Sequence, residues 1–597
     1  MISIALSCMA QHRKGQDRAV NGKPSYPRAL PAPKDFDMNT GFLLTIGLVF
    51  LQLLKVSRAS TSDFIIVGGG TSGCVLAARL CVAFPDASIS VLERGKPLNE
   101  SARFVKDAMR NVIDAWVDPQ ISESFLSLPN DGLSGRRVLL TTGAVLGGSS
   151  SSNAVQFVVP LEGYVRSLGI AGLSPMRAKR LYRRVYRKVG FRPQPPLVKL
   201  RYADDYLEAG RNAGFEIEDD PFRNNARLAM WNTRSSIDGG GRRVDSCAAY
   251  LNENVRDRCS ANLRVVQGVT VIRVLFSRTG LSLRATGVEY VSSDDKQLQD
   301  RKVMLARKEV LLSAGPYGSP KLLQLSGIGP REVLDRVGLK TVRDLPVGVS
   351  TQSRAASGHF SAYTGVPLEP ANNSTVLNST DARQQWENGL GGVYGSSPFP
   401  MNGVVKDICY LTNVLAFGGL LEGLDEPLLA SFCLGNPTSR GYICLNDSNP
   451  FSSPLVQLDL LGNREDLLRI QRCLRLVQKV HRSFPPQFKL TDLSQTSADE
   501  EEIRNTALTP FHYVGGCAVG SVVRSDLRVR GVYGLRIVDA SVLRHIPTSA
   551  GPLSTTYVVA EHAAGDLIRR YRCRFGRCRR RVWWLRFGHW LLGHSSL

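Results

Sequence analysis

The N-terminal third of the chain contains two apolar runs separated by a helical pattern. Residues 63–67, Asp-Phe-Ile-Ile-Val, predict a buried strand, and residues 88–92, Ser-Ile-Ser-Val-Leu, predict another. Apolar positions at helical spacing lie between them, over residues 74–80. Strand, helix and strand in this order are typical of a parallel sheet, so the pattern indicates an α/β protein.

Similar patterns continue to the C-terminus. Further strands are expected at residues 263–266, 269–272, 285–290, 308–312 and 534–538, the first three as hairpin strands. Further helices are expected at residues 316–326, 465–481 and 555–568. A polar, helix-like segment is expected up to about residue 130, and the region 350–400, rich in Ser, Asn and Gly, is expected to form loops.

The turn between the first strand and helix carries candidate chemistry. Gly68, Gly70 and Gly73 form G-x-G-x-x-G, and Glu93 follows the second strand. The glycines permit a tight turn, close approach of a pyrophosphate, and close packing of helix on strand. Thr71 and Ser72 open the helix, whose N-terminal N–H groups attract anions, and Glu93 can bind a ribose diol. We therefore expect a dinucleotide site; a plain glycine-rich turn is the alternative.

Two further segments can complete such a site. Residues 143–154 include Gly147, Gly148 and a run of small residues, which predicts a backbone-lined loop against a ligand. His512 stands among small residues before the strand that ends at Asp539. Histidine titrates near neutral pH and suits a general base, although a lone histidine is often structural.

The net charge of +23 suggests a nucleic-acid partner, but its distribution argues against one. Residues 1–60 carry +5 and residues 569–597 carry +9, so most of the excess lies outside the central region. The tail of Arg and Trp beyond residue 570 suits weak contact with an anionic membrane surface, or is a plain extension.

The N-terminal region suggests a secretory route. The apolar run at residues 41–54 is too short to span a bilayer and resembles a signal peptide, with Ala59 and Ser60 offering a cleavage site. A membrane anchor or a buried helix is the alternative. A secreted glycoprotein is expected, with sequons at Asn99, Asn372, Asn373, Asn378 and Asn446.

The twelve cysteines show no paired metal spacing, so no metal site is expected. Cys433 and Cys444 are expected either to form a disulfide or to remain buried thiols.

Taken together, the ordered motifs resemble the glucose–methanol–choline family of FAD oxidoreductases, and most of all its plant branch of mandelonitrile lyases and HOTHEAD-type proteins. The resemblance runs from about residue 63 to residue 568. It implies a Rossmann-like FAD-binding domain interleaved with a substrate domain built on an antiparallel sheet. The segments it implies are an extension with signal peptide (1–60), FAD-binding parts (61–160, 240–350 and 505–570), substrate-domain parts (161–239 and 351–504) and a basic tail (571–597).

The resemblance also implies roles for individual residues. FAD would bind through Gly68, Gly70, Thr71, Ser72, Gly73, Glu93, Gly147, Gly148, Asn153, Ala154, Val271 and Asp539. His512 would be the catalytic base that accepts the hydroxyl proton of an alcohol while its hydride passes to flavin N5. Oxygen or another acceptor would then reoxidise the flavin. A lyase that uses FAD without redox change, and a flavin-bound protein with little activity, are the alternatives.

Three departures from the family pattern bear on catalysis. Gly551 stands where the family usually has a second catalytic His or Asn, and His545 is near in sequence but does not match. Ala144 replaces a common Arg or Lys, and Val349-Ser-Thr351 replaces acidic or amide residues. These changes affect the expected catalysis more than the expected FAD binding. No motif in the sequence identifies the substrate, and a long aliphatic alcohol is expected only by analogy to the plant branch.

Overall fold

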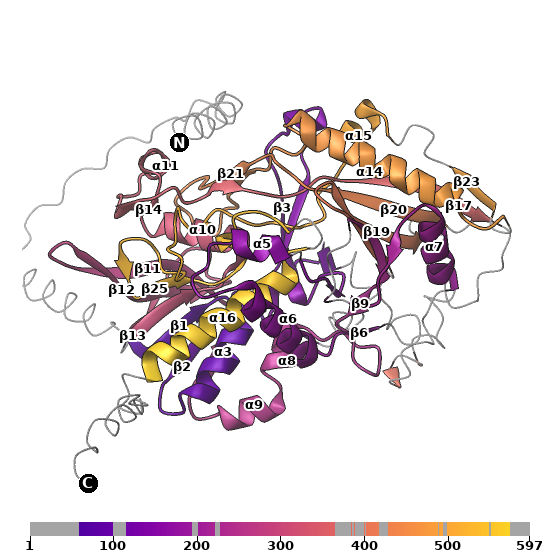
Figure 1. The fold of residues 1–597 in the computed structure, drawn as a ribbon. Helices are drawn as coiled ribbons and strands as arrows, with labels where there is room; N and C mark the ends of the chain where they lie inside the picture. The colour runs from indigo at the N-terminus through magenta and orange to yellow at the C-terminus, as the bar shows by residue number, and fades with distance from the viewer. Residues whose placement is uncertain are drawn as a thin grey trace, which may run out of the picture.

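The computed structural model describes residues 59–99, 115–116, 118–160, 162–193, 201–220, 222, 227–364, 384, 387–388, 399, 401–416, 428–486, 489–492, 498–547 and 551–572. Two large sheets lie next to each other, with helices packed against them (Figure 1). None of the described helices has the length and apolar character that crossing a bilayer requires. The expected signal peptide and basic tail lie outside the described residues.

The first sheet has a parallel core. Its strands run in the order β10, β2, β1 and β13, with β25 parallel to the second half of β13. Antiparallel β11 and β12 extend it from the first half of β13. The bounds are β1 (Ser60–Val67), β2 (Ile89–Leu92), β10 (Leu263–Val266), β11 (Val269–Thr279), β12 (Ser282–Ser292), β13 (Lys302–Leu312) and β25 (Leu535–Ile537). Residues 64–67 of β1 are almost fully buried, as both faces of a parallel sheet are covered.

Helices α3 (Thr71–Ala83) and α16 (Leu553–Arg572) lie side by side and α6 (Pro175–Val189) packs against α16 (Figure 1). Disulfides fasten α3 to the segment that contains α8 (Ser246–Tyr250) and α9 (Glu253–Arg258): Cys74 joins Cys247 and Cys81 joins Cys259. Helix α3, which begins at the glycine motif, is therefore packed against α16 and bonded covalently to the segment of α8 and α9.

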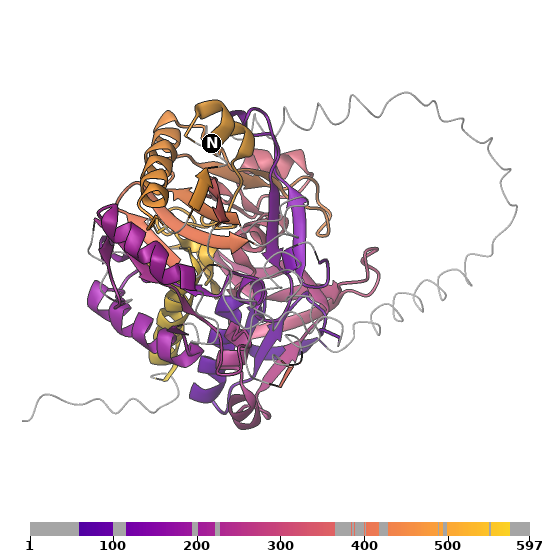
Figure 2. The same ribbon diagram turned by 90° about the vertical axis from the view of Figure 1, so that its right-hand side faces the viewer.

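The second sheet is antiparallel apart from its β7–β8 edge and has the order β23, β17, β20, β19, β18, β8, β7. Helix α14 (Arg464–Arg482) packs on β17 and β20, and α7 (Arg201–Asn212) packs on α14. Both views show the orange α14 against the orange strands (Figures 1 and 2). The bounds are β7 (Glu216–Ile217), β8 (Leu228–Asn232), β17 (Ala356–Thr364), β18 (Met401–Val405), β19 (Cys409–Ala416), β20 (Leu428–Gly435) and β23 (Lys489–Asp492).

Shorter elements complete the fold, and one of them, β24, pairs with β12 of the first sheet. They are β3 (Ser122–Leu126), β4 (Leu139–Gly143), β5 (Gln156–Phe157), α5 (Glu162–Ser167), β6 (Arg192–Pro193), β9 (Arg234–Ser235), α10 (Gly315–Leu325), β14 (Ile328–Gly329), α11 (Arg331–Arg336), β15 (Arg343–Asp344), β16 (Val349–Thr351), β21 (Gly441–Cys444), β22 (Leu455–Gln457), α15 (Glu500–Thr506) and β24 (Val532–Tyr533). The mixed α/β class with an antiparallel second sheet is confirmed. The predicted domain boundaries stay a prediction.

Three local expectations were wrong. Residues 263–266 do not form a hairpin with 269–272, because β10 joins the parallel sheet beside β2. Residues 122–126 and 356–364, expected as helix-like and loop, form β3 and β17, because β3 pairs with the nearby β4 and β17 pairs with the distant β20. Of the two alternatives expected for Cys433, the structure shows the free buried thiol, so Cys433 is not the partner of Cys444. A separate disulfide joins Cys409 and Cys473 beside it.

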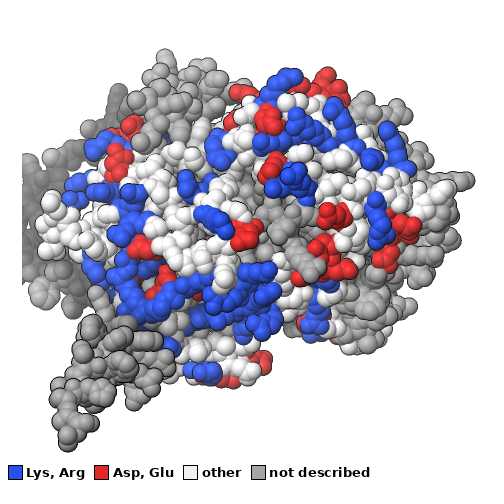
Figure 3. Space-filling model, viewed as in Figure 1, with Lys and Arg blue, Asp and Glu red and all other residues white. Residues whose placement is uncertain are grey.

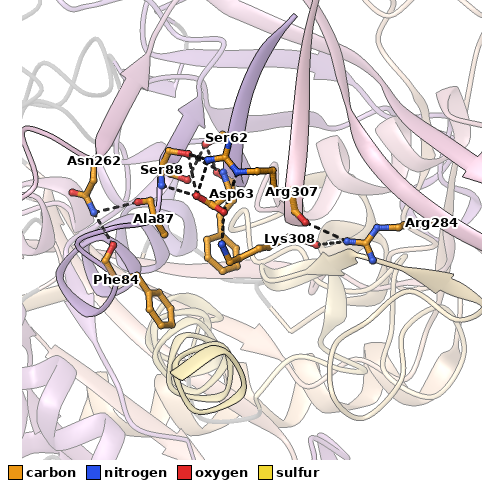
Figure 4. Close-up of polar contacts among 10 residues, drawn as sticks. Ser62, Asp63, Phe84, Ala87, Ser88, Asn262, Arg284, Arg307 and Lys308 are labelled. Carbon is orange, nitrogen blue, oxygen red and sulfur yellow. Dashed lines mark hydrogen bonds and ion pairs between the residues drawn. The ribbon is translucent and has the colours of Figure 1, made fainter. Parts of the chain in front are cut away.

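A buried carboxylate fixes the start of β1. Asp63 accepts hydrogen bonds from Ser88 N (2.9 Å), Arg307 Nη2 (2.8 Å) and Lys308 Nζ (Figure 4). Burial alone would raise the pKa of Asp63, but the hydrogen bonds from Arg307 and Lys308 outweigh it and hold the pKa well below its usual value. The contacts join β1 to the start of β2 and to β13, so they hold the parallel core in register.

Basic side chains also gather on the surface of the described fold. Helix α6 exposes Lys179, Arg180, Arg183, Arg184, Arg187 and Lys188 and contains no acidic residue. Figure 3 shows Lys and Arg crowded over the region of α6 and α16. The apolar face of α6 packs into the core, so only the charged face meets solvent.

Candidate active site

The glycine turn after β1 is packed tightly at two of its three glycines. Gly68 has a φ of +95°, and a Cβ there would lie 2.5 Å from Ser313 O. A Cβ on Gly73 would lie 2.0 Å from Gly68 O, so the helix can approach the turn only without a side chain. A Cβ on Gly70 would meet no protein atom closer than 3.7 Å. The space beside Gly70 is thus left open by the protein.

The N-terminus of α3 offers donors beside that space. Gly70 is its N-cap, no side chain caps the helix, and its first turn has no acidic residue. The hydroxyl of Ser72, in the first turn with Thr71, is buried and has no hydrogen-bond partner among the described residues. Orphan N–H groups and a hydroxyl at a helix N-terminus match a pyrophosphate, so these residues fit the FAD that the motifs imply.

Glu93 closes the other side of the glycine turn. Its carboxylate accepts hydrogen bonds from Gly69 N (2.6 Å) and Gly95 N (2.8 Å). Burial raises the pKa of Glu93, and the two backbone hydrogen bonds oppose the rise. The peptide of Glu93 also bonds to Val269 N, which brings the strand of Val271 next to it. The structure thus gathers these residues at one end of the parallel sheet, where α/β proteins bind nucleotides.

The loop of small residues lies directly on the glycine turn. Gly147 N donates to Gly69 O over 2.8 Å, and a Cβ on Gly148 would lie 2.7 Å from Gly70 Cα. Farther along, Asn153 Oδ1 accepts from Arg243 Nη1 (2.7 Å), and Asn153 and Ala154 are half-buried. Backbone-to-backbone contact of this closeness requires glycine, which explains the composition of the loop.

Trp116 connects this loop to the loop of the candidate base. Its Nε1 donates to Ser152 O (3.1 Å), and its ring packs edge-on against Phe511, with centroids 4.6 Å apart. Because His512 follows Phe511, the indole places the histidine loop beside the residues around Asn153. The sequence pattern gave no role to Trp116, which lies in a segment expected to be merely polar.

His512 is half-buried, and its Nδ1 is sealed from solvent with no hydrogen-bond partner among the described residues. A Cβ on Gly551 would lie 2.6 Å from His512 Nε2. Burial, reinforced by the charge of Arg354, lowers the pKa of His512 well below its usual value. His545, the other histidine nearby in sequence, instead bonds through Nε2 to Ser167 Oγ (2.7 Å).

Asp539 is held by protein donors on both carboxylate oxygens. Oδ2 accepts from Gly315 N (3.0 Å) and Ser319 Oγ (2.6 Å), and Oδ1 accepts from Ser541 N and Oγ. It ties the turn after β25 to the start of α10. The carboxylate is thus an anchor, and a contact with flavin at this position would come from the neighbouring backbone.

Two buried arginines escaped the sequence analysis. Arg243 contacts the loop of Asn153, and Arg354, with no exposed surface, lies near His512. Each sits among small and polar residues with no recognisable spacing, so the sequence carries no signal that either arginine is buried.

Comparison with known proteins agrees with this geometry. The GMC oxidoreductase models match residues 62–354 and 437–560. The chain is 30% identical to an (R)-mandelonitrile lyase-like protein of Arabidopsis thaliana, over 85% of this chain and 90% of that protein. It is 28% identical to the GMC oxidoreductase family protein Mala s 12 of Malassezia sympodialis, over 85% and 92%. A crystal structure of formate oxidase superposes with a TM-score of 0.73 at 20% identity, covering 86% of this chain and 99% of that one.

These matches span most of the chain and include both halves of the site. The resemblance inferred from the ordered motifs is confirmed, and FAD is the cofactor of such oxidoreductases. The protein belongs to the GMC oxidoreductase family.

Proposed function

We propose that the protein oxidises the CH–OH group of an alcohol with FAD, and that His512 is the base. The observation that supports this most is the placement of His512. The ring is half-buried and its loop is locked by Trp116 onto the loop of Asn153, which lies against the glycine turn. A proton acceptor therefore stands where the cofactor-binding segments converge.

The electrostatics of His512 suit proton removal. Since burial and Arg354 lower its pKa, the imidazole is neutral at neutral pH and has a lone pair to accept a hydroxyl proton. Nε2 is the nitrogen next to Gly551, on the partly exposed side, so we assign the proton transfer to Nε2.

The remaining residues would bind the cofactor and orient it. The N-terminus of α3, with Thr71 and Ser72, would bind the pyrophosphate of FAD. Glu93 and Val271 would bind its adenosine. Gly147, Gly148, Asn153 and Ala154 would lie beside the flavin, supported by Arg243. When bound, FAD would supply the redox chemistry, as the acceptor of the hydride from the carbinol carbon, with oxygen or another acceptor as the final oxidant.

The proposal is tested by mixing the purified holoenzyme anaerobically with a panel of alcohols while recording the visible spectrum. Oxidation bleaches the flavin. A matched pair, His512→Ala and His545→Ala, separates the base from a structural histidine. We expect His512→Ala to slow bleaching and His545→Ala to keep it. Equal bleaching rates in the wild type and His512→Ala would refute the catalytic role.

A lyase reaction is the second candidate, because one similar protein is named mandelonitrile lyase-like. There His512 would deprotonate a cyanohydrin and FAD would keep its redox state. Release of cyanide without any flavin bleaching would identify this reaction. If no variant and no substrate shows either activity, the flavin is a structural ligand.

Secretion is a further proposal. The pairs Cys74–Cys247, Cys81–Cys259 and Cys409–Cys473 fit an oxidising compartment. N-terminal sequencing of the native protein tests it, and a mature N-terminus at Met1 would overturn it.

Weak contact with an anionic membrane through the basic tail is also a proposal. The Arg and Trp residues of the tail suit the surface of an anionic membrane, and the exposed face of α6 is basic as well. Deleting residues 573–597 should weaken sedimentation with anionic vesicles and leave flavin bound. Undiminished sedimentation of the truncated protein would exclude the tail as the contact.

A further inference from the structure

Arg354 is a positive charge without solvent exposure in the middle of the candidate site. It is placed by an irregular antiparallel pairing. Gln352 bridges to Val514 and Ala356 bridges to Leu508, each through two backbone hydrogen bonds of 2.8–3.0 Å. Arg354 lies midway between the two bridges, so the pairing sets it opposite residues 510–512, the segment that contains His512.

Residues 352–354 also bond to the loop that leads to Gly551. Arg354 Nη2 donates to Pro547 O (2.5 Å), and Gln352 Oε1 accepts from Ile546 N (2.9 Å). On the other side, Ser353 Oγ bonds to Thr509 Oγ1 (2.8 Å). Three consecutive buried side chains therefore connect the loop of His512 to the loop of Gly551.

The charge of Arg354 is not dispersed by water. Burial lowers its pKa to about 10, which still leaves the guanidinium charged at neutral pH. In a site with little solvent, charges interact more strongly than at the surface. The charge of Arg354 acts on His512, and the charges of Arg440 and Arg544 act on His545. Tyr164 and Tyr410 lie around Arg354, and burial raises the pKa of both phenols, so they are uncharged at neutral pH.

We propose that Arg354 is a positioning and specificity-determining residue: it joins the two loops that carry His512 and Gly551, and its fixed charge excludes cationic alcohols in favour of uncharged or anionic ones. The selectivity rests on the proposed oxidation, because the substrate must approach His512. The action of the charge on His512 does not depend on that reaction.

Three variants separate charge from shape. Arg354→Met removes the charge and keeps much of the length. Arg354→Lys keeps a charge at neutral pH but loses it at lower pH than arginine does. Arg544→Met is the matched control, because it removes an exposed positive charge three residues before Pro547.

The first measurement needs no substrate. NMR of the histidine-labelled holoenzyme, with the His512 signal assigned by its loss in His512→Asn, gives the protonation of His512 against pH. We expect Arg354→Met to raise its proton affinity by roughly tenfold, and Arg354→Lys and Arg544→Met to leave it near the wild type at neutral pH. An unchanged His512 titration in Arg354→Met would overturn the electrostatic role.

The second measurement compares choline with its uncharged isostere, in which a tert-butyl group replaces the trimethylammonium group. The wild type should reduce its flavin faster with the isostere, by about tenfold or more in kcat/KM. Arg354→Met should lose this preference, and Arg354→Lys should keep it at neutral pH and lose it as pH rises. Equal preference in the wild type and Arg354→Met would overturn the selectivity. If neither alcohol nor any other reduces the flavin, the proposed oxidation and its selectivity fail, while the NMR result still decides the action on His512.

Discussion

A methyl group added at Gly70 should weaken flavin binding and leave the fold intact, whereas one added at Gly73 should destabilise the fold. At Gly70 the backbone (φ −79°, ψ −162°) suits any residue, and the nearest atoms to a new Cβ are Gly148 Cα at 3.7 Å and Ser313 O at 3.8 Å. Gly70→Ala should leave the apoprotein intact, or stabilise it by about 0.4–1 kcal/mol through the unfolded chain. The methyl nevertheless enters the space that we assign to the pyrophosphate, so flavin binding should weaken.

Gly73→Ala should instead damage the fold. Its Cβ would lie 2.0 Å from Gly68 O, which is 1.0 Å short of the 3.0 Å that real Cβ contacts respect. The helix and the turn must separate, and overpacking of this kind costs about 1–3 kcal/mol in the free energy of unfolding. Flavin is then lost because its site has moved.

The assay combines the ratio of flavin to protein absorbance with denaturant unfolding of the FAD-stripped proteins. Gly70→Val, which adds two further methyls, should be colourless yet retain an apoprotein close to wild type in stability. Stripped wild type is the reference, since bound FAD itself stabilises the fold by mass action. A Gly70→Val protein with a full flavin spectrum would refute the placement of the pyrophosphate. A Gly70→Ala apoprotein as unstable as Gly73→Ala would refute the packing argument.

Three further outcomes are expected. His512→Ala should cut flavin reduction by about 10²–10⁴-fold with FAD still bound, measured by stopped-flow absorbance; an unchanged rate would contradict it. Gly551→Asn, which restores a residue that the family usually has there, should lower that rate, because its Cβ would push into the His512 ring at 2.6 Å; a faster variant would show that the ring can move aside. Asp63→Asn should cost about 1.5–3 kcal/mol of unfolding free energy at neutral pH. Because the folded pKa of Asp63 is depressed, its contribution is present above about pH 4 and falls as the pH decreases, so the wild-type and Asn curves should converge in acid; parallel curves would exclude the ion pair.

Local sequence determined the nucleotide half of the site almost completely. The strand, the glycine turn and the helix depend on neighbours within a few residues, and Gly68 and Gly73 each have a steric reason that appears in the structure. The helices α14 and α16 were likewise predictable, since their apolar positions repeat at helical spacing over many residues.

The sequence did not predict which strands pair with each other. Residues 263–266 look like half of a hairpin, yet β10 pairs with β2, some 170 residues earlier, at the edge of the parallel sheet. The pairing of β17 with β20, and the free thiol of Cys433, follow from the same long-range choice. Apolar alternation predicts a strand but carries no information on its neighbour.

The surroundings of His512 show most clearly which features the sequence does not predict. The sequence by itself determined the family, and it predicted the candidate cofactor segments and the candidate base, because these depend on residue types at short spacings. Only the tertiary structure decided that Trp116 fixes the loop of His512, that Gly551 leaves no room beside the ring, and that Arg354 brings a buried charge to it. Those three facts join segments separated by up to several hundred residues, and the free energy of such contacts depends on distances that no local pattern records.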